Sequence, residues 1–144
     1  RLAVVERPDT ARRLRRQRER LREAVTSLPG VEITGHPVER LPGILSLIVR
    51  DADGAALQMA LDLDGLACST GSACTTGSTE PSHVLTAMGY PEDEARGALR
   101  LSLGRTTTDA EVATAGELVR AAIDHHRAAS ALLAAEGVGM ELSA

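Results

Sequence analysis

The near absence of aromatic side chains is the feature that most limits what this chain can fold into. None of its 144 residues is Phe or Trp and only Tyr90 is Tyr, although 43% are hydrophobic. A core must therefore be assembled from Leu, Val, Ile, Ala and Met, with burial spread over many small aliphatic contacts. The length and balance predict one soluble globular domain. Stacking of nucleotide bases on aromatic rings is almost excluded.

The hydrophobic pattern predicts an α+β fold in which helices cover a small sheet. Four segments read as strands by alternation or by a continuous apolar run: residues 31–34, 44–49, 66–68 and 99–103. Five segments read as helices by apolar spacing and terminal signals: residues 8–28, 55–63, 81–88, 91–95 and 108 to about 135. The last helix begins with a capping box, Thr108 to Glu111, and is expected to fray at Gly137 and Gly139.

All sixteen basic residues are Arg, and the chain contains no Lys. A chain without Lys cannot form a Schiff base with pyridoxal phosphate or a carbonyl substrate, and it has no phosphate-loop lysine. The net charge of −4 argues against general affinity for nucleic acid. Seven Arg nevertheless lie between Arg12 and Arg22. This segment is interpreted as a solvated helix face, with an acidic partner or nucleic acid as the alternative.

Two cysteines are too few for a disulfide scaffold, which favours a reducing compartment. No apolar run approaches membrane-spanning length, and no signal-peptide pattern is recognisable. The expected location is therefore the cytoplasm.

Cys74 is the candidate nucleophile because it lies within a run of small residues, 69–79, that contains no large apolar side chain and no charge. A packed structural cysteine normally has bulky neighbours, but an inert loop thiol is the open alternative. Cys68 follows two apolar residues and is interpreted as a small buried hydrophobe. The spacing C-x5-C is not a zinc pattern, so no metal site is predicted. A regulatory disulfide between the two cysteines is the lesser alternative.

Arg100 is the candidate anion-binding residue. In the predicted strand 99–103 the leucines alternate onto one face, so Arg100 and Ser102 occupy the other. A guanidinium there can bind a carboxylate through two parallel hydrogen bonds, and a surface ion pair is the alternative. Arg105, at the end of this strand, is expected to have a structural role.

The four histidines give weaker indications. His83 is expected to be a partly buried histidine rather than a general base. His36 has no partner in the sequence. His125 and His126 are adjacent on one helix and cannot share a face, which argues against metal binding.

Three motifs in residues 66–107 are specific in combination: S-T-G-S-A-C, E-P-S-H-V-L and R-L-S-L-G-R. The segment resembles the C-terminal part of the pyridoxal-phosphate-dependent cysteine desulfurases, fold-type I enzymes of the class V aminotransferase group. The resemblance implies removal of sulfur from L-cysteine, giving L-alanine and a persulfide on a loop cysteine. Cys74 matches that cysteine, and Arg100 matches the arginine that holds the substrate carboxylate. Cys68 matches a position usually filled by a small aliphatic residue.

The resemblance also implies parts that this chain lacks. The family's cofactor lysine and its phosphate contacts lie in a large domain, and a chain without Lys contains no such site. Residues 1–144 are therefore predicted to be the small C-terminal domain, beginning at Arg1 rather than Met, with no cofactor-binding residue of its own. The parent is expected to be a cytoplasmic homodimer that passes sulfur to an acceptor protein. The alternative is a stand-alone sulfur-carrier or interaction module.

The destination of the sulfur is left open by the sequence. Iron–sulfur cluster assembly, tRNA thiolation and DNA sulfur modification all fit the resemblance.

Overall fold

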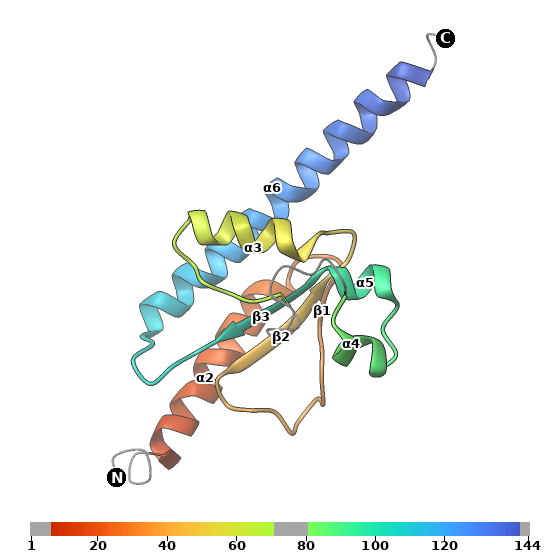
Figure 1. Ribbon diagram of the computed structural model, residues 1–144. Helices are drawn as coiled ribbons and strands as arrows, with labels where there is room; N and C mark the ends of the chain where they lie inside the picture. Colours follow the sequence, from red (N-terminus) through yellow and green to blue (C-terminus); the bar gives the residue numbers. More distant parts are fainter. Residues whose placement is uncertain (1–6, 71–80, 142–144) are drawn as a thin grey trace.

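The protein is an α+β domain, as predicted. The computed structural model describes residues 7–70 and 81–141 (Figure 1). Its elements are, in chain order, α2 (Arg7–Thr26), β1 (Val31–Ile33), β2 (Ile44–Val49), α3 (Gly54–Leu63), α4 (His83–Ala87), α5 (Glu92–Arg96), β3 (Ala98–Ser102) and α6 (Asp109–Glu141).

The three strands form an antiparallel sheet in the order β1-β2-β3. The mostly aliphatic strand β2 lies at the centre of the sheet, as expected for the most apolar of the strands, and four of its six residues are buried. In the register, Leu47 lies opposite Ile33 on β1 and opposite Leu99 on β3. Because side chains alternate across a sheet, these three residues share one face, and Ser46 and Arg100 share the other.

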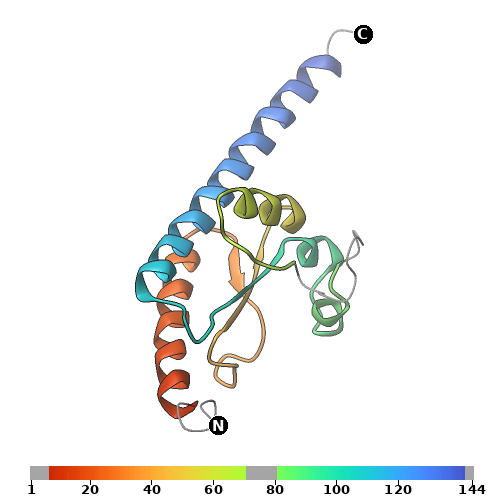
Figure 2. The same cartoon turned by 60° about the vertical axis from the view of Figure 1, so that its left-hand side comes forward.

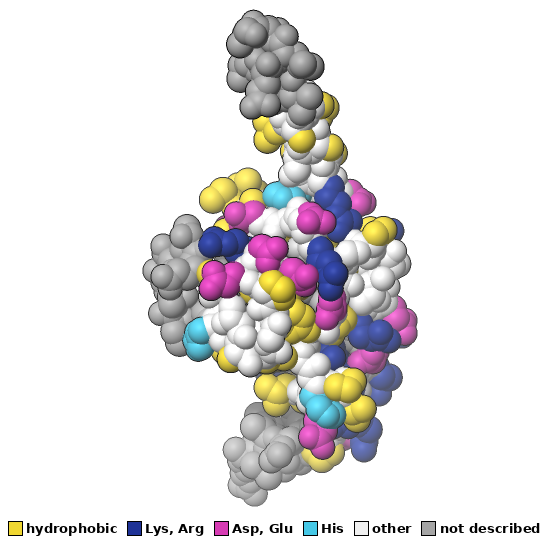
Figure 3. All heavy atoms as spheres, turned by 90° about the vertical axis from the view of Figure 1, so that its right-hand side faces the viewer, with side chains coloured by type: hydrophobic (Ala, Val, Ile, Leu, Met, Phe, Trp, Pro, Cys, Tyr) yellow, Lys and Arg dark blue, Asp and Glu magenta, His cyan; other side chains and the backbone are white. Residues whose placement is uncertain are grey.

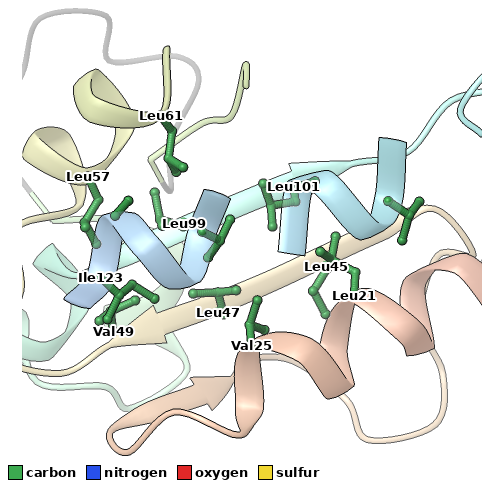
Figure 4. Packing of buried hydrophobic residues seen from close by; sticks show 14 residues of the cluster. Leu21, Val25, Leu45, Leu47, Val49, Leu57, Leu61, Leu99, Leu101 and Ile123 are labelled. Carbon is green, nitrogen blue, oxygen red and sulfur yellow. The ribbon is translucent and has the colours of Figure 1, made fainter. Parts of the chain in front are cut away.

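One face of the sheet is covered by α2, α3 and α6, which lie together on the same side of the strands (Figure 2). The core between them is aliphatic throughout, as the composition requires. Leu21 and Val25 of α2 point toward the leucines of β2, and Ile123 of α6 lies near Val49 (Figure 4). Leu57 and Leu61 of α3 complete the cluster above Leu99.

Among the described residues, the opposite face is covered by the two short helices α4 and α5, which lie at one end of it. Leu85 and Ala95 from these helices pack on Ile48 and Ala98 of the sheet, with Tyr90 at the edge of the cluster. Seen from this side, acidic and basic side chains are interspersed over the body of the molecule (Figure 3). Because Ser46 and Arg100 lie on this face of the sheet, it is the less apolar of the two faces.

The buried residue Gln17 connects α2 to the start of α6 through hydrogen bonds. Gln17 is 1% exposed, and its amide donates to the Thr107 carbonyl oxygen at 3.0 Å and to Asp109 Oδ1 at 2.8 Å. Its Oε1 accepts from the Arg13 guanidinium at 2.9 Å. Each polar atom of a buried amide needs such a partner, because an unpaired one is costly. The contact therefore fixes the register of the two long helices.

The predicted capping box at the start of α6 is confirmed. The Thr108 backbone N–H donates to Glu111 Oε2 at 2.7 Å, and the Glu111 backbone N–H donates to Thr108 Oγ1 at 3.2 Å. The backbone hydrogen bond from Thr108, followed by that from its hydroxyl, lowers the pKa of Glu111.

Two predictions about element extent are wrong. The expected strand at 66–68 does not form: Gln58 Nε2 donates to the Cys68 carbonyl oxygen at 3.1 Å, and pairing is limited to a single bridge at Ser69. The last helix continues beyond Ala135 to Glu141 through Gly137 and Gly139. Each glycine costs a helix only about 1 kcal/mol, which does not end a helix of 33 residues.

The C-terminal part of α6 projects away from the body of the domain (Figure 1). Leu132 and Leu133 on this part are 67% and 70% exposed. No helix within residues 7–70 and 81–141 is both long and apolar enough to cross a membrane.

Candidate functional site

Arg100 lies in the middle of β3 on the less apolar face, as strand parity predicted. Its backbone N–H donates to the Ser69 carbonyl oxygen at 2.7 Å, and its own carbonyl accepts from the Ser69 N–H at 3.1 Å. The segment that follows α3 is therefore joined to the outer edge of β3 at this residue. The Arg100 side chain is half-buried.

Ser46 lies directly opposite Arg100 in the β2–β3 register. Both backbone hydrogen bonds of Arg100 point away from β2, toward Ser69. Ser46 and Arg100 consequently form a non-hydrogen-bonded pair, the type in which the Cα atoms approach to about 4.5 Å and the side chains lie closest.

Thr34 follows β1 and lies next to Ser46 on the side of β2 away from Arg100. Its hydroxyl donates to Ser46 Oγ at 2.8 Å, and its backbone N–H donates to the Ser46 carbonyl oxygen at 3.0 Å. Thr34 is 4% exposed, so this hydroxyl pair is shielded from solvent on one side. We define Thr34, Ser46 and Arg100 as the polar row.

Sequence reasoning identified Arg100 but missed the other two members of the polar row. The signal for Ser46 was present, because it is the one polar residue in the run 44–49 and shares its parity with the outward face. Thr34 could not be identified, because its pairing with Ser46 depends on the register of two strands joined by an irregular connection.

The two cysteines differ in what the structure describes. Cys74 falls in residues 71–80 and lies outside the described residues. Cys68 packs against the main core, as expected of a small hydrophobe, but it is half-buried rather than buried. Burial, with a smaller contribution from the charge of Asp62, raises the pKa of the Cys68 thiol. Cys68 is therefore mostly protonated near neutral pH and a poor nucleophile.

The prediction that His83 is partly buried is wrong, because the side chain is exposed. Helix α4 has only five residues and directs Leu85 toward the sheet, which leaves His83 and Val84 on its outer side.

Two other histidines accept hydrogen bonds from backbone N–H groups. His36 Nδ1 accepts from the backbone N–H groups of Val38 and Glu39 at 3.2 and 2.8 Å, which closes a turn. His126 Nε2 accepts from the Asp53 N–H at 3.3 Å. Across residues 7–70 and 81–141, no three His, Cys, Asp or Glu side chains are grouped so that they could hold a metal ion.

Several arginines of the Arg-rich helix α2 form hydrogen bonds to other parts of the molecule. Arg13 donates to the backbone carbonyl oxygens of Thr107 and Arg105, both at 2.6 Å. Arg18, whose side chain is 10% exposed, donates to the Leu41 carbonyl oxygen at 3.0 Å. The interpretation as a fully solvated face is therefore wrong for these two arginines, which connect α2 to loops.

Further along α2, Glu19 lies between two arginines. Arg18 and Arg22 donate to its carboxylate at 2.7 and 2.6 Å. The hydrogen bond from Arg18, followed by that from Arg22, lowers the pKa of Glu19.

The residues of this chain do not fit a complete pyridoxal-phosphate site. That cofactor is held through a lysine amine, and the sequence contains no Lys. What the chain offers is a guanidinium on a rigid strand, which can bind a carboxylate group.

Comparison with known proteins agrees with the resemblance. Residues 5–114 match the aminotransferase class-V family. The chain is 46% identical over 132 residues to an IscS-like cysteine desulfurase of Mycobacterium tuberculosis, covering 90% of this chain and 33% of that protein. It is 41% identical over 118 residues to a cysteine desulfurase IscS of Methanosarcina thermophila, covering 82% of this chain and 29% of that protein.

Among solved structures, a NifS-like protein of Rickettsia africae has the same fold, with a TM-score of 0.75 and 27% identity. The match covers 85% of this chain and 31% of the NifS-like protein. The chain thus spans about a third of the length of the proteins that it matches.

Proposed function

The chain belongs to the aminotransferase class-V family, and from this premise we propose that it forms the small C-terminal domain of a pyridoxal-phosphate-dependent cysteine desulfurase. The large domain of the parent would supply the cofactor, including the lysine that residues 1–144 lack. The domain described here would supply the group that binds the substrate carboxylate and the thiol that accepts sulfur.

The observation that carries the proposal is the junction between Ser69 and Arg100. Arg100 lies in the motif R-L-S-L-G-R, and its backbone is hydrogen-bonded in both directions to Ser69. Cys74 follows Ser69 by five residues, a length of chain that reaches at most about 17 Å. A substrate bound through its carboxylate at Arg100 is therefore within the range that Cys74 can reach.

The chemistry assigned to the chain balances. The Cys74 thiol loses its proton and its sulfur bonds to the sulfur of L-cysteine. The carbon–sulfur bond of the substrate breaks, its electron pair stays on the substrate carbon, and that carbon takes up a proton in place of the one that the thiol lost. The products are L-alanine and a persulfide on Cys74. When bound in the parent, the cofactor stabilises negative charge on the substrate carbon. Arg100 contributes by orienting the substrate through its carboxylate.

The first test distinguishes the two cysteines. In the full-length parent treated with L-cysteine, Cys74→Ser should abolish persulfide formation, because it removes the accepting thiol. Cys68→Ser is the matched control and should retain it, because the Cys68 thiol is half-buried against the core and its pKa is raised. Mass spectrometry of the peptides containing each cysteine measures both outcomes.

A persulfide that survives in Cys74→Ser but not in Cys68→Ser would refute the assignment. A wild-type parent that forms no persulfide from L-cysteine would favour the sulfur-carrier or interaction module, which would have to receive its sulfur from elsewhere.

The second test concerns the carboxylate. Arg100→Ala should raise the KM of the parent for L-cysteine about 100-fold, because loss of a charge-assisted bidentate contact costs a few kcal/mol. Arg100→Lys keeps the charge without the paired geometry and should give a smaller rise. Steady-state alanine release measures KM and kcat, and an unchanged KM in Arg100→Ala would contradict the role.

The remaining parts of the proposal follow from the family. We propose that the parent is a cytoplasmic homodimer and that the persulfide sulfur passes to an acceptor protein. The sequencing of DNA upstream of the codon for Arg1 would test the domain assignment, because the reading frame should encode a domain with the cofactor lysine.

A further inference from the structure

We propose that Ser46, held in place by Thr34, is a positioning residue that orients the Arg100 guanidinium toward the substrate carboxylate. This inference rests on the proposed function. It assigns to the domain a polar group beyond the guanidinium and the accepting thiol.

The pairing geometry provides the first argument. Ser46 and Arg100 are directly opposed in the register, and their backbone hydrogen bonds run outward, to Thr34 on one side and to Ser69 on the other. This is the close type of antiparallel pair, so the Ser46 side chain lies beside the stem of Arg100. A guanidinium has five N–H donors and no acceptor, and a serine oxygen can accept one of them.

The second argument is that Ser46 is itself fixed. Thr34 donates to Ser46 Oγ at 2.8 Å, and Thr34 is 4% exposed. A free serine hydroxyl changes rotamer readily, whereas one tied to a buried neighbour presents its oxygen in one direction. The Ser46 oxygen keeps a second lone pair for Arg100.

The third argument is the composition of this face of β2. Three side chains of the strand lie on it, and the two neighbours of Ser46 are Ile44 and Ile48. Ile48 is buried under α4 and α5, where an aliphatic side chain is required. Packing alone would favour an aliphatic residue at position 46 as well, because central strands are stabilised by β-branched apolar side chains. The hydroxyl at position 46 accepts from the buried Thr34 hydroxyl and, in the register, lies opposite Arg100.

The test uses a pair of isosteric variants of the full-length parent. Ser46→Val and Ser46→Thr add the same bulk, but only Thr retains a hydroxyl. Ser46→Val should raise KM for L-cysteine about tenfold with kcat within about twofold of wild type, the effect of one hydrogen bond to a charged group. Ser46→Thr should stay within about twofold of wild type in both constants. Thr34→Val should raise KM by about threefold, and Thr34→Ser should not.

A second readout separates positioning from a general loss of structure. L-alanine carries the carboxylate and L-alaninamide does not, so each is measured as a competitive inhibitor of the parent. In Ser46→Val, inhibition by L-alanine should weaken as much as cysteine binding, and inhibition by L-alaninamide should be unchanged. Equal weakening of both inhibitors would overturn the inference, because it would indicate a disordered site.

The outcomes keep this inference apart from the proposed function. If Arg100→Ala raises KM but Ser46→Val behaves like Ser46→Thr, the positioning role is refuted and the desulfurase assignment stands. If the wild-type parent releases no alanine from L-cysteine, the proposed function fails and this inference fails with it.

Discussion

The two faces of the sheet are built from alternate residues of the same strands, yet they have different tasks. Leu45, Leu47 and Val49 of β2 are completely buried beneath three helices. Their immediate neighbour Ser46 faces the other way, opposite Arg100, on the face that carries α4 and α5 at one end. Most of the apolar burial in the domain is therefore on one side of the sheet, and the candidate site is on the other.

This separation lets a functional side chain change at little cost to folding. A residue on the covered face leaves a cavity when it is shortened, because many atoms pack around it. Ser46 and Arg100 of the polar row are partly solvated, so the loss of either side chain affects what the surface binds more than whether the chain folds. The difference can be measured on adjacent residues of β2.

The largest loss of stability is expected from a substitution on the face of the sheet that α2, α3 and α6 cover. Leu47→Ala should lower the free energy of unfolding of the 144-residue chain by about 3 kcal/mol, because Leu47 is 0% exposed and its removal leaves a cavity in the main core. Urea unfolding followed by circular dichroism measures the change.

The matched control is the next residue along the strand. Ser46→Ala removes the acceptor of the buried Thr34 hydroxyl and should lower the free energy of unfolding by about 1 kcal/mol, clearly less than Leu47→Ala. Equal losses in the two variants would show that the faces do not differ in the way described.

A smaller effect, on the titration of a single side chain, is expected at Tyr90. This residue lies at the edge of the cluster that α4 and α5 form on the sheet. Burial, followed by the hydrogen bond from its hydroxyl to Glu32 at 3.1 Å and by nearby negative charges, raises the pKa of Tyr90. A raised pKa means that folding favours the neutral phenol. Its contribution to stability is thus complete below the ordinary pKa of tyrosine and is lost as the pH rises through the folded-state value.

Ultraviolet titration can follow this residue alone, because the chain has one Tyr and no Trp. The midpoint should lie higher in the folded chain than in the same chain in concentrated urea. In Glu32→Gln the midpoint should move back toward the ordinary value without reaching it, because burial is the largest cause of the shift. Identical midpoints in folded and unfolded wild type would contradict the prediction.

Local patterns predicted the elements and the faces of the sheet well. The alternation over 99–103 assigned Arg100 to the outward face, and the capping box located the start of α6. These features depend on residues close in sequence. Two other features depend on partners farther away in the sequence. His83 is exposed because α4 packs on the sheet through Leu85, and the strand at 66–68 is missing because the Cys68 carbonyl accepts from Gln58.

The same distinction between nearby and distant residues applies to the candidate site. Arg100 could be identified from parity and motif, whereas its surroundings could not. Thr34 and Ser46 are twelve residues apart and meet through strand pairing across an irregular loop. The assignment of Cys74 stays a prediction, because residue 74 lies outside the described residues.

The borders of the sheet have a consequence for the solubility of the 144-residue chain. An open strand edge is a template on which another chain can add a strand and begin aggregation. Here the outer border strand β1 has only three residues and carries the charged Glu32, and the outer border of β3 is occupied at its centre by Ser69. Within the described residues, a neighbouring molecule therefore finds only short stretches of backbone on which to assemble.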